Sequence, residues 1–180
     1  MMSDAAKEFI LHWGEMGTRW GVNRTVAQVH ALLYLSADAL TAEEIADALT
    51  VARSNVSTSL KELQNWNLVQ IESRMGDRRD FFRTSPEVWA LFMTVVEQRV
   101  ERELAPTMAM LKRCVATAQG EGQSQAVVKT RVRAMQEFLE EIHGWYFQVR
   151  KLPPATLRSL ISMGSGISRI LPKARRRRLD

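Results

Sequence analysis

The sequence predicts a mainly α-helical chain that carries one small β-hairpin. Three observations indicate this class. Apolar residues recur at helical spacing on both sides of the middle of the chain. In the middle, a short helix with a strong start signal is followed, after a tight turn, by a second short helix. The apolar period then changes from helical to alternating, and a charged tip that contains glycine separates the two alternating runs.

Four helices are expected before the hairpin, at residues 3–20, 25–36, 41–49 and 52–65. The third has the clearest start, because Thr41 and Glu44 form a capping box in which each side chain satisfies a free backbone N–H. The turn after it contains Thr50 where glycine is common, so we expect slight backbone strain there. Ala52 stands where a capping serine or threonine is usual.

Two strands, at residues 69–72 and 80–83, form the hairpin, and its tip spans residues 74–79. Beyond it the pattern predicts a long helix at 86–119, which begins at Pro86 and is kinked at Pro106. The chain then continues through a helix at 124–150 and a weak amphipathic segment at 157–171, interrupted by Gly164 and Gly166.

This order, two short helices joined by a tight turn and followed at once by a hairpin, is that of a winged helix-turn-helix domain. The apolar stripes of the flanking helices are too extensive for so small a domain to cover, so we expect a two-fold dimer. The expected organisation is an N-terminal dimerisation helix at 1–22, the winged domain at 23–85, a long helical dimerisation arm at 86–151 and an amphipathic, Arg-rich tail at 152–180.

Charge and composition limit the partners. The net charge is +5, but residues 173–180 alone hold five bases and one acid, so the rest of the chain is nearly neutral. A basic surface elsewhere must therefore be local. No apolar run approaches the roughly 20 residues that span a bilayer, and no signal-peptide core is present at the N-terminus. We expect a cytoplasmic protein without a membrane partner, whose tail adds non-specific phosphate contacts.

Catalysis is not indicated. The three histidines, His12, His30 and His143, lack a second ligand at helical spacing, so no metal site is expected. No glycine-rich phosphate loop occurs, and we expect no cofactor. Cys114 has no cysteine partner and lies among apolar residues, which is typical of a structural thiol.

The helix at 52–65 carries the candidate DNA-reading residues. Val56, Leu60 and Leu63 form the stripe that must face the core, which leaves short polar and cationic side chains on the other side. Such side chains suit base edges and phosphates in a major groove. The candidates, here called the recognition face, are Arg53, Ser54, Asn55, Ser57, Thr58 and Lys61.

Arginines of the hairpin are the second set of candidates. Arginines at the tip of a wing can enter a narrow, strongly negative minor groove. Asp77 and Asp80 lie among them, and we expect the aspartates to orient an arginine by a charge-assisted pair. The wing candidates are Arg74, Arg78, Arg79 and Arg83.

Several motifs resemble the MarR superfamily. They are TAEEIADAL at 41–49, RSNVS at 53–57 and LKELQNWNLV at 60–69, while GDRR at 76–79 and ELAPT at 103–107 resemble the GbsR-type branch. The resemblance covers about residues 5–150. It implies a dimer that binds a pseudo-palindromic operator, that in most members represses transcription, and that in several responds to a small molecule. Asn67 replaces a usual glycine, but asparagine tolerates a left-handed helix cap.

An effector site is a further expectation. Aromatic faces attract quaternary ammonium ions, and the GbsR-type resemblance implies choline-like compounds. The residues expected near such a cleft are Trp13, Trp20, Tyr34 and Trp89. The alternative to a DNA reader is a winged-helix module that binds proteins, because a fold alone does not fix a function.

Overall fold

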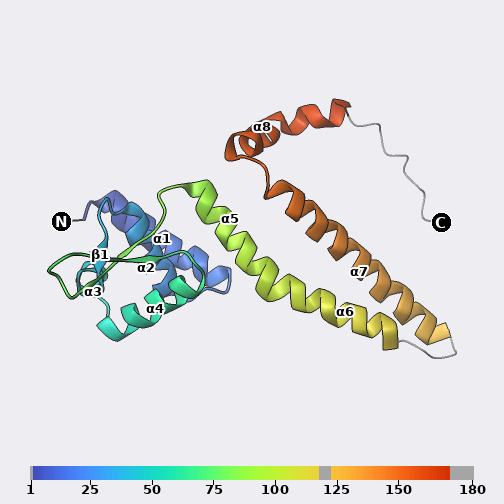
Figure 1. Cartoon of the computed structure of the whole chain (residues 1–180), viewed down its shortest axis with the longest axis horizontal. Coiled ribbons are helices and arrows are strands. Elements are labelled where there is room, and N and C mark those ends of the chain that lie inside the picture. The colour runs from blue at the N-terminus through green and yellow to red at the C-terminus, as the bar shows by residue number, and fades with distance from the viewer. Residues whose placement is uncertain (1, 118–122, 171–180) are drawn as a thin grey trace. The chain divides into compact units, whose positions relative to one another are not determined.

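A computed structural model describes residues 2–117 and 123–170 of the 180-residue chain, with the side chains of residues 123–124 and 164–170 left undescribed. The chain divides into two compact units, Met1–Arg99 and Val100–Asp180. The predicted class is confirmed, since the chain is mainly helical with one small sheet (Figure 1). None of the described helices is long and apolar enough to cross a membrane.

Five helices build the first unit. The four helices predicted before the hairpin are all present, with ends within one or two residues of the expected ones. They are α1 (Asp4–Arg19), α2 (Arg24–Leu35), α3 (Ala42–Leu49) and α4 (Arg53–Asn65), and α5 (Val88–Arg99) follows the hairpin (Figure 1). Pro86 lies two residues before α5 rather than at its first position. The Ser85 hydroxyl accepts from the Glu87 backbone N–H over 3.2 Å, so the chain turns there before the helix begins.

A three-stranded antiparallel sheet accompanies these helices. The hairpin strands are β2 (Gln70–Ser73) and β3 (Asp80–Arg83), and β1 (Leu40–Thr41) pairs with the other edge of β3. The sequence did not predict β1, because two residues are too few to show an alternating pattern. The pairing places Thr41, Phe81 and Glu72 in one row across the three strands.

The core of this unit lies between α2, α3, α4 and the sheet. Val29, Ile45, Val56 and Leu60 are its largest fully buried side chains, and Phe82 joins them from β3. Helix α1 packs on α2 through small residues. A Cβ atom added at Gly17 would lie only 2.6 Å from the Ala27 Cβ, so the two backbones approach as closely as they do because glycine has no side chain.

Local geometry agrees with the predictions made for the turns. Thr41 and Glu44 form the capping box, with the Glu44 carboxylate accepting from the Thr41 N–H over 2.7 Å. Thr50 and Asn67 both take up left-handed backbone, at φ 55° and 54°, which carries some strain for residues other than glycine. Ala52 gives α4 no capping side chain.

The described residues of the second unit, 100–117 and 123–170, form helices and no strand. A π-helical segment, Val100–Leu104, leads into α6 (Ala105–Thr117), and α7 (Gln123–Val149) packs against α6. The interruption predicted at Pro106 takes the form of this π segment in the turn before the proline. Because proline has no backbone N–H, it cannot donate the helical hydrogen bond to the preceding turn. A π bulge is one way in which a helix accommodates the loss of that bond.

The last helix, α8 (Pro154–Ile170), is longer than the amphipathic segment expected at 157–171. It begins at Pro154, where the missing N–H costs nothing. It also continues through Gly164 and Gly166, which corrects the expected interruption. Glycine inside a helix costs only about 1 kcal/mol relative to alanine, so it weakens a helix without ending it. The Arg-rich run at 173–178 lies outside the described residues.

Candidate nucleic-acid interface

The recognition face lies exposed on α4. Its six residues are all exposed, whereas Val56, Leu60 and Leu63 point into the core from the other side of the helix. Only three residues separate α3 from α4, and the first of them, Thr50, has a left-handed backbone that helps to turn the chain between the two helices. Six short polar or cationic side chains therefore share one solvent-facing surface.

Hydrogen bonding within α4 limits which contacts the Thr58 side chain can make with DNA. The Thr58 hydroxyl donates to the Ser54 carbonyl over 3.0 Å, so its proton is engaged within the helix. It keeps an acceptor lone pair and a methyl group, the latter suited to a thymine methyl. The start of α4 has no capping side chain, and an uncapped helix N-terminus is a favourable place for a phosphate.

The tip of the wing holds an ordered ion pair. Arg79 donates to both oxygens of Asp77, from Nη2 to Oδ2 over 2.7 Å and from Nε to Oδ1 over 3.0 Å. Hydrogen bonds from the Arg79 side chain and backbone lower the pKa of Asp77 to about 2, so the carboxylate stays charged at neutral pH. The expected aspartate–arginine pairing is present, and it fixes the plane of the Arg79 guanidinium.

The other wing arginines differ in how they are held. The Arg74 guanidinium lies 3.9 Å from the centre of the Phe81 ring, and its Nε is 3.8 Å from a Glu72 oxygen. Arg83 is 3.5 Å from the other Glu72 oxygen. Arg78 is exposed and makes no ion pair with another described residue. The wing thus presents one unpaired cation and three that its own groups position.

Two further residues, Phe81 in the wing and Glu44 in α3, lie near the wing arginines, a placement that the sequence patterns did not predict. Phe81 is 4 % exposed although it lies outside the main core cluster. Glu44 has a lowered pKa, chiefly because the Thr41 backbone and hydroxyl donate to it, with smaller contributions from Arg79 and Arg74. The Glu44 carboxylate at the start of α3 therefore interacts electrostatically with Arg79 and Arg74 of the wing. No local sequence pattern could reveal this interaction, because the residues are far apart in the chain.

A buried hydrogen-bonded link joins the wing to α2. The Thr84 hydroxyl donates to the Leu68 carbonyl over 2.6 Å, and its oxygen lies 3.3 Å from the His30 Nε2. Since the Thr84 proton is already engaged, this geometry favours the His30 tautomer that donates from Nε2. Burial lowers the pKa of His30 to about 4, so the ring is neutral at physiological pH.

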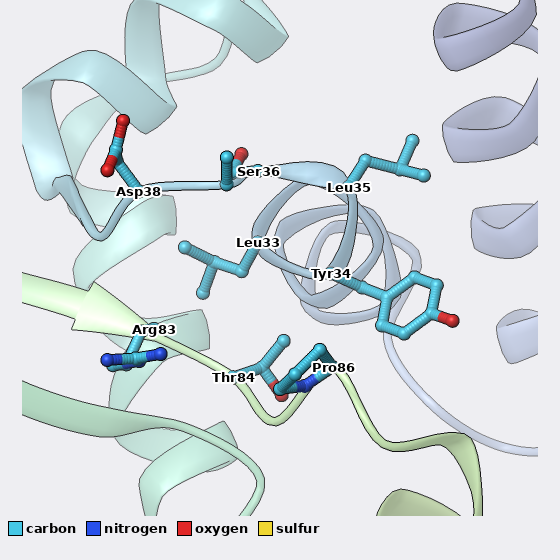
Figure 2. Close-up of a pocket in the computed structure, with 9 residues that line it drawn as sticks. Leu33, Tyr34, Leu35, Ser36, Asp38, Arg83, Thr84 and Pro86 are labelled. Carbon is cyan, nitrogen blue, oxygen red and sulfur yellow. The ribbon is translucent and has the colours of Figure 1, made fainter.

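The four residues expected at an effector cleft differ in their surroundings. Trp13 stacks on Phe9 at 5.3 Å, Trp89 meets Phe92 edge-on at 6.0 Å, and Trp20 is 64 % exposed. A hollow of about 280 Å³ lies at the end of α2 and is lined by Tyr34 alone of the four. Figure 2 shows Asp38 and Arg83 toward the other end of this hollow.

Metal-binding geometry is not found in the described part of the chain, where no three His, Cys, Asp or Glu residues are grouped so that they could hold an ion. Cys114 is half-buried in α6, with its sulfur 3.5 Å from that of Met110.

Parts of this chain are similar in sequence or fold to known proteins. Residues 20–80 match the MarR family. The chain is 24% identical, over 100 residues, to the HTH-type transcriptional repressor GbsR of Bacillus subtilis (strain 168). That match covers 56% of this chain and 55% of the repressor, so the chain spans about half the length of this curated relative.

A solved structure supports the fold. A crystal structure of a transcriptional regulator aligns with a TM-score of 0.57 and 20% identity, covering 80% of this chain and 99% of that one. The matched family segment contains α2, α3, α4 and the first part of the wing, which agrees with the resemblance drawn from the motifs. Residues 20–80, which hold the helix-turn-helix and the first part of the wing, are therefore a MarR-family segment of this chain.

Proposed function

We propose that this chain binds double-stranded DNA as a two-fold dimer, reads a pseudo-palindromic operator and represses transcription. The observation that carries the proposal is the recognition face, six exposed polar or cationic side chains on a helix whose opposite side is anchored in the core. The wing adds four arginines, three of which are held by groups of the wing itself. Repression is suggested by the relative named above, which is a repressor.

The dimer is supported by an apolar stripe on α7. At 3.6 residues per turn, its members fall within about 100° of the helix circumference. They are at least 44 % exposed in the single chain: Val127, Val128, Met135, Phe138, Ile142 and Trp145. Tyr146 lies beside this stripe and is buried, and α7 also packs against α6. A helix that is apolar on two adjacent faces usually has two partners, and a second copy supplies the missing one.

The dimer also explains how one short recognition face can specify an operator. A two-fold pair of recognition helices reaches successive major grooves when they lie about 34 Å apart. Each half then contributes the same contacts to one half-site, which doubles the contact energy. An effector that binds one spacing better than another would shift operator affinity. Its chemical class, a quaternary ammonium compound, stays a prediction.

A fluorescence anisotropy titration of duplex DNA tests the proposal. The wild-type chain should bind, and its affinity should fall steeply as salt rises, because each neutralised phosphate releases counterions. A triple variant that combines Asn55→Ala, Thr58→Ala and Arg79→Gln should lose most of this affinity. Arg133→Gln is the control, since it removes one exposed positive charge from α7, far along the chain from the recognition face.

Two results would contradict the DNA-binding assignment. One is a triple variant that binds an operator fragment as tightly as the wild type. The other is wild-type binding that does not change between low and high salt, which would favour the alternative of a winged-helix module that binds proteins.

A further inference from the structure

We propose that Phe81 is a positioning residue for DNA binding, whose ring holds the Arg74 and Arg79 guanidiniums in place on the wing before DNA arrives. The inference rests on the proposed function, and it assigns a role to a residue that would otherwise be counted as part of the hydrophobic core. It concerns order in the unbound wing, and the contacts to DNA are made by the arginines themselves.

The position of Phe81 in the sheet separates it from the core. It pairs with Thr41 on one side and with Glu72 on the other, while its neighbour Phe82 pairs with Leu40 and Ile71. Successive strand residues point to opposite faces. Phe82 belongs to the main core cluster and Phe81 does not. Phe81 is therefore on the other face of the sheet from Phe82.

Two arginine side chains lie close to the Phe81 ring. The Arg74 guanidinium carbon is 3.9 Å from the centre of the Phe81 ring, and that of Arg79 is 5.5 Å away. Both distances are within the range in which a guanidinium is attracted by the ring quadrupole. Phe81 is only 4 % exposed, and its strand partners on this face, Thr41 and Glu72, are polar.

Carboxylates complete the arrangement at the edges of the two guanidiniums. A Glu72 oxygen lies 3.8 Å from the Arg74 Nε, and both oxygens of Asp77 accept from the Arg79 guanidinium. Each guanidinium is thus held by a ring and by a carboxylate. Two long side chains with many rotamers are confined to one face of the wing, and the positive charge is concentrated there.

This confinement should strengthen binding by lowering its entropic cost. Ordering a rotamer-rich side chain at an interface carries an entropic cost. If the ring provides part of that order for two arginines, its loss should weaken DNA binding by about fivefold to tenfold. The number of phosphates neutralised should not change, so the slope of affinity against salt should stay near that of the wild type.

The experiment compares Phe81→Leu with Phe82→Leu. Both remove an aromatic ring from adjacent positions of β3, but only Phe81 contacts the arginines. The probe is a short fluorescent duplex of mixed sequence that contains an A·T tract. Phe82→Leu should lower the thermal midpoint and leave the affinity of the folded protein unchanged. Phe81→Leu should weaken binding by the stated factor, and Phe81→Tyr, which keeps the ring, should restore it.

A spectroscopic readout makes the test independent of binding. In the wild type the ring current of Phe81 should shift the Arg74 side-chain protons upfield in an NMR spectrum, and the shift should vanish in Phe81→Leu. If Phe81→Leu does not fold, Arg74→Lys probes the contact from the other side. It keeps the exposed charge but replaces the flat guanidinium by a compact ammonium, and it should weaken binding to a similar extent.

The outcomes separate the two proposals. A wild type that shows no salt-dependent binding to the duplex overturns the proposed function and this inference with it. A wild type that binds, together with a Phe81→Leu variant that is folded and binds equally well, overturns the inference alone. The same holds if the Arg74 protons show no ring-current shift, or if Phe81→Leu binds more tightly.

Discussion

Replacing Gly17 by alanine should destabilise the first unit, even though alanine is the better helix former. Gly17 lies in α1, where an added Cβ would be 2.6 Å from the Ala27 Cβ and 3.8 Å from the Val22 Cβ. Carbon atoms pack best at about 3.5–4.0 Å, so the helices must separate by roughly 1 Å. The neighbouring Ala27 atom is attached directly to the backbone of α2 and cannot rotate away.

The magnitude follows from two opposing effects. Alanine in place of a helical glycine stabilises by about 0.5–1 kcal/mol. Overpacking a well-packed contact costs about 1–3 kcal/mol. The second effect should win, which gives a net loss of about 1 kcal/mol in the free energy of unfolding. That loss corresponds to a fall of a few degrees in the thermal midpoint.

Two other glycines provide matched controls for the same chemical change. At Gly144 in α7 an added Cβ meets nothing within 4 Å, so Gly144→Ala should be neutral or stabilising. At Gly14 it would lie 2.7 Å from the Gln28 Cγ, an atom of a flexible side chain that can move. We therefore expect Gly14→Ala to cost less than Gly17→Ala.

Urea titration followed by circular dichroism measures all three variants, and a shift of the midpoint at constant slope reports a change in stability. A Gly17→Ala variant as stable as the wild type, or more stable, would refute the close approach of α1 and α2. Equal effects of all three substitutions would show that helix propensity alone governs these positions.

Four other predictions concern DNA reading, assembly, pH and the tail. Asn55→Ala should cost about 1–3 kcal/mol at the operator and relax base preference there, which selection from a random duplex pool would show. Phe138→Glu, which puts a charge into the α7 stripe, should give a monomer of about half the mass in light scattering; an intact dimer would exclude this stripe from the interface. The pKa of His30 is about 4 in the folded protein against 6.5 for the free side chain, so its contribution to stability should be present above pH 6.5 and be lost as the pH falls toward 4. His30→Gln should reduce that acid dependence in pH-resolved thermal unfolding, and an unchanged profile would assign it to other groups. Deleting residues 173–180 should lower affinity for random duplex without altering the dimer, and unchanged affinity would leave the tail no role in phosphate binding.

Local sequence was enough to predict most elements of the winged domain. The capping box at Thr41 depends on residues three positions apart, and the inward stripe of α4 depends on spacings of three and four. The left-handed geometry at Thr50 and Asn67 follows from where helices end. In each case the interacting groups lie within one helical turn, so the pattern that encodes them can be read directly from the chain.

The recognition face and the wing arginines could be predicted for the same reason. Once Val56 and its companions are assigned to the core, the residues on the other side of α4 must face solvent. Whether those residues contact DNA stays a prediction. The packing of the effector residues could not be predicted in the same way, because aromatic side chains from α1, α2 and α5 can pack together in many arrangements; of the four, Tyr34 lines the hollow at the end of α2.

By itself, then, the sequence determined the class of fold, the order of its helices and the face that α4 exposes. Only the tertiary structure decided that a two-residue strand, Leu40–Thr41, would complete the sheet, that Gly17 would meet Ala27, and that Arg74 would lie close to the Phe81 ring. The physical reason is the range of the interactions. Caps and stripes act over a few residues, whereas these contacts join positions whose proximity depends on how the whole unit packs.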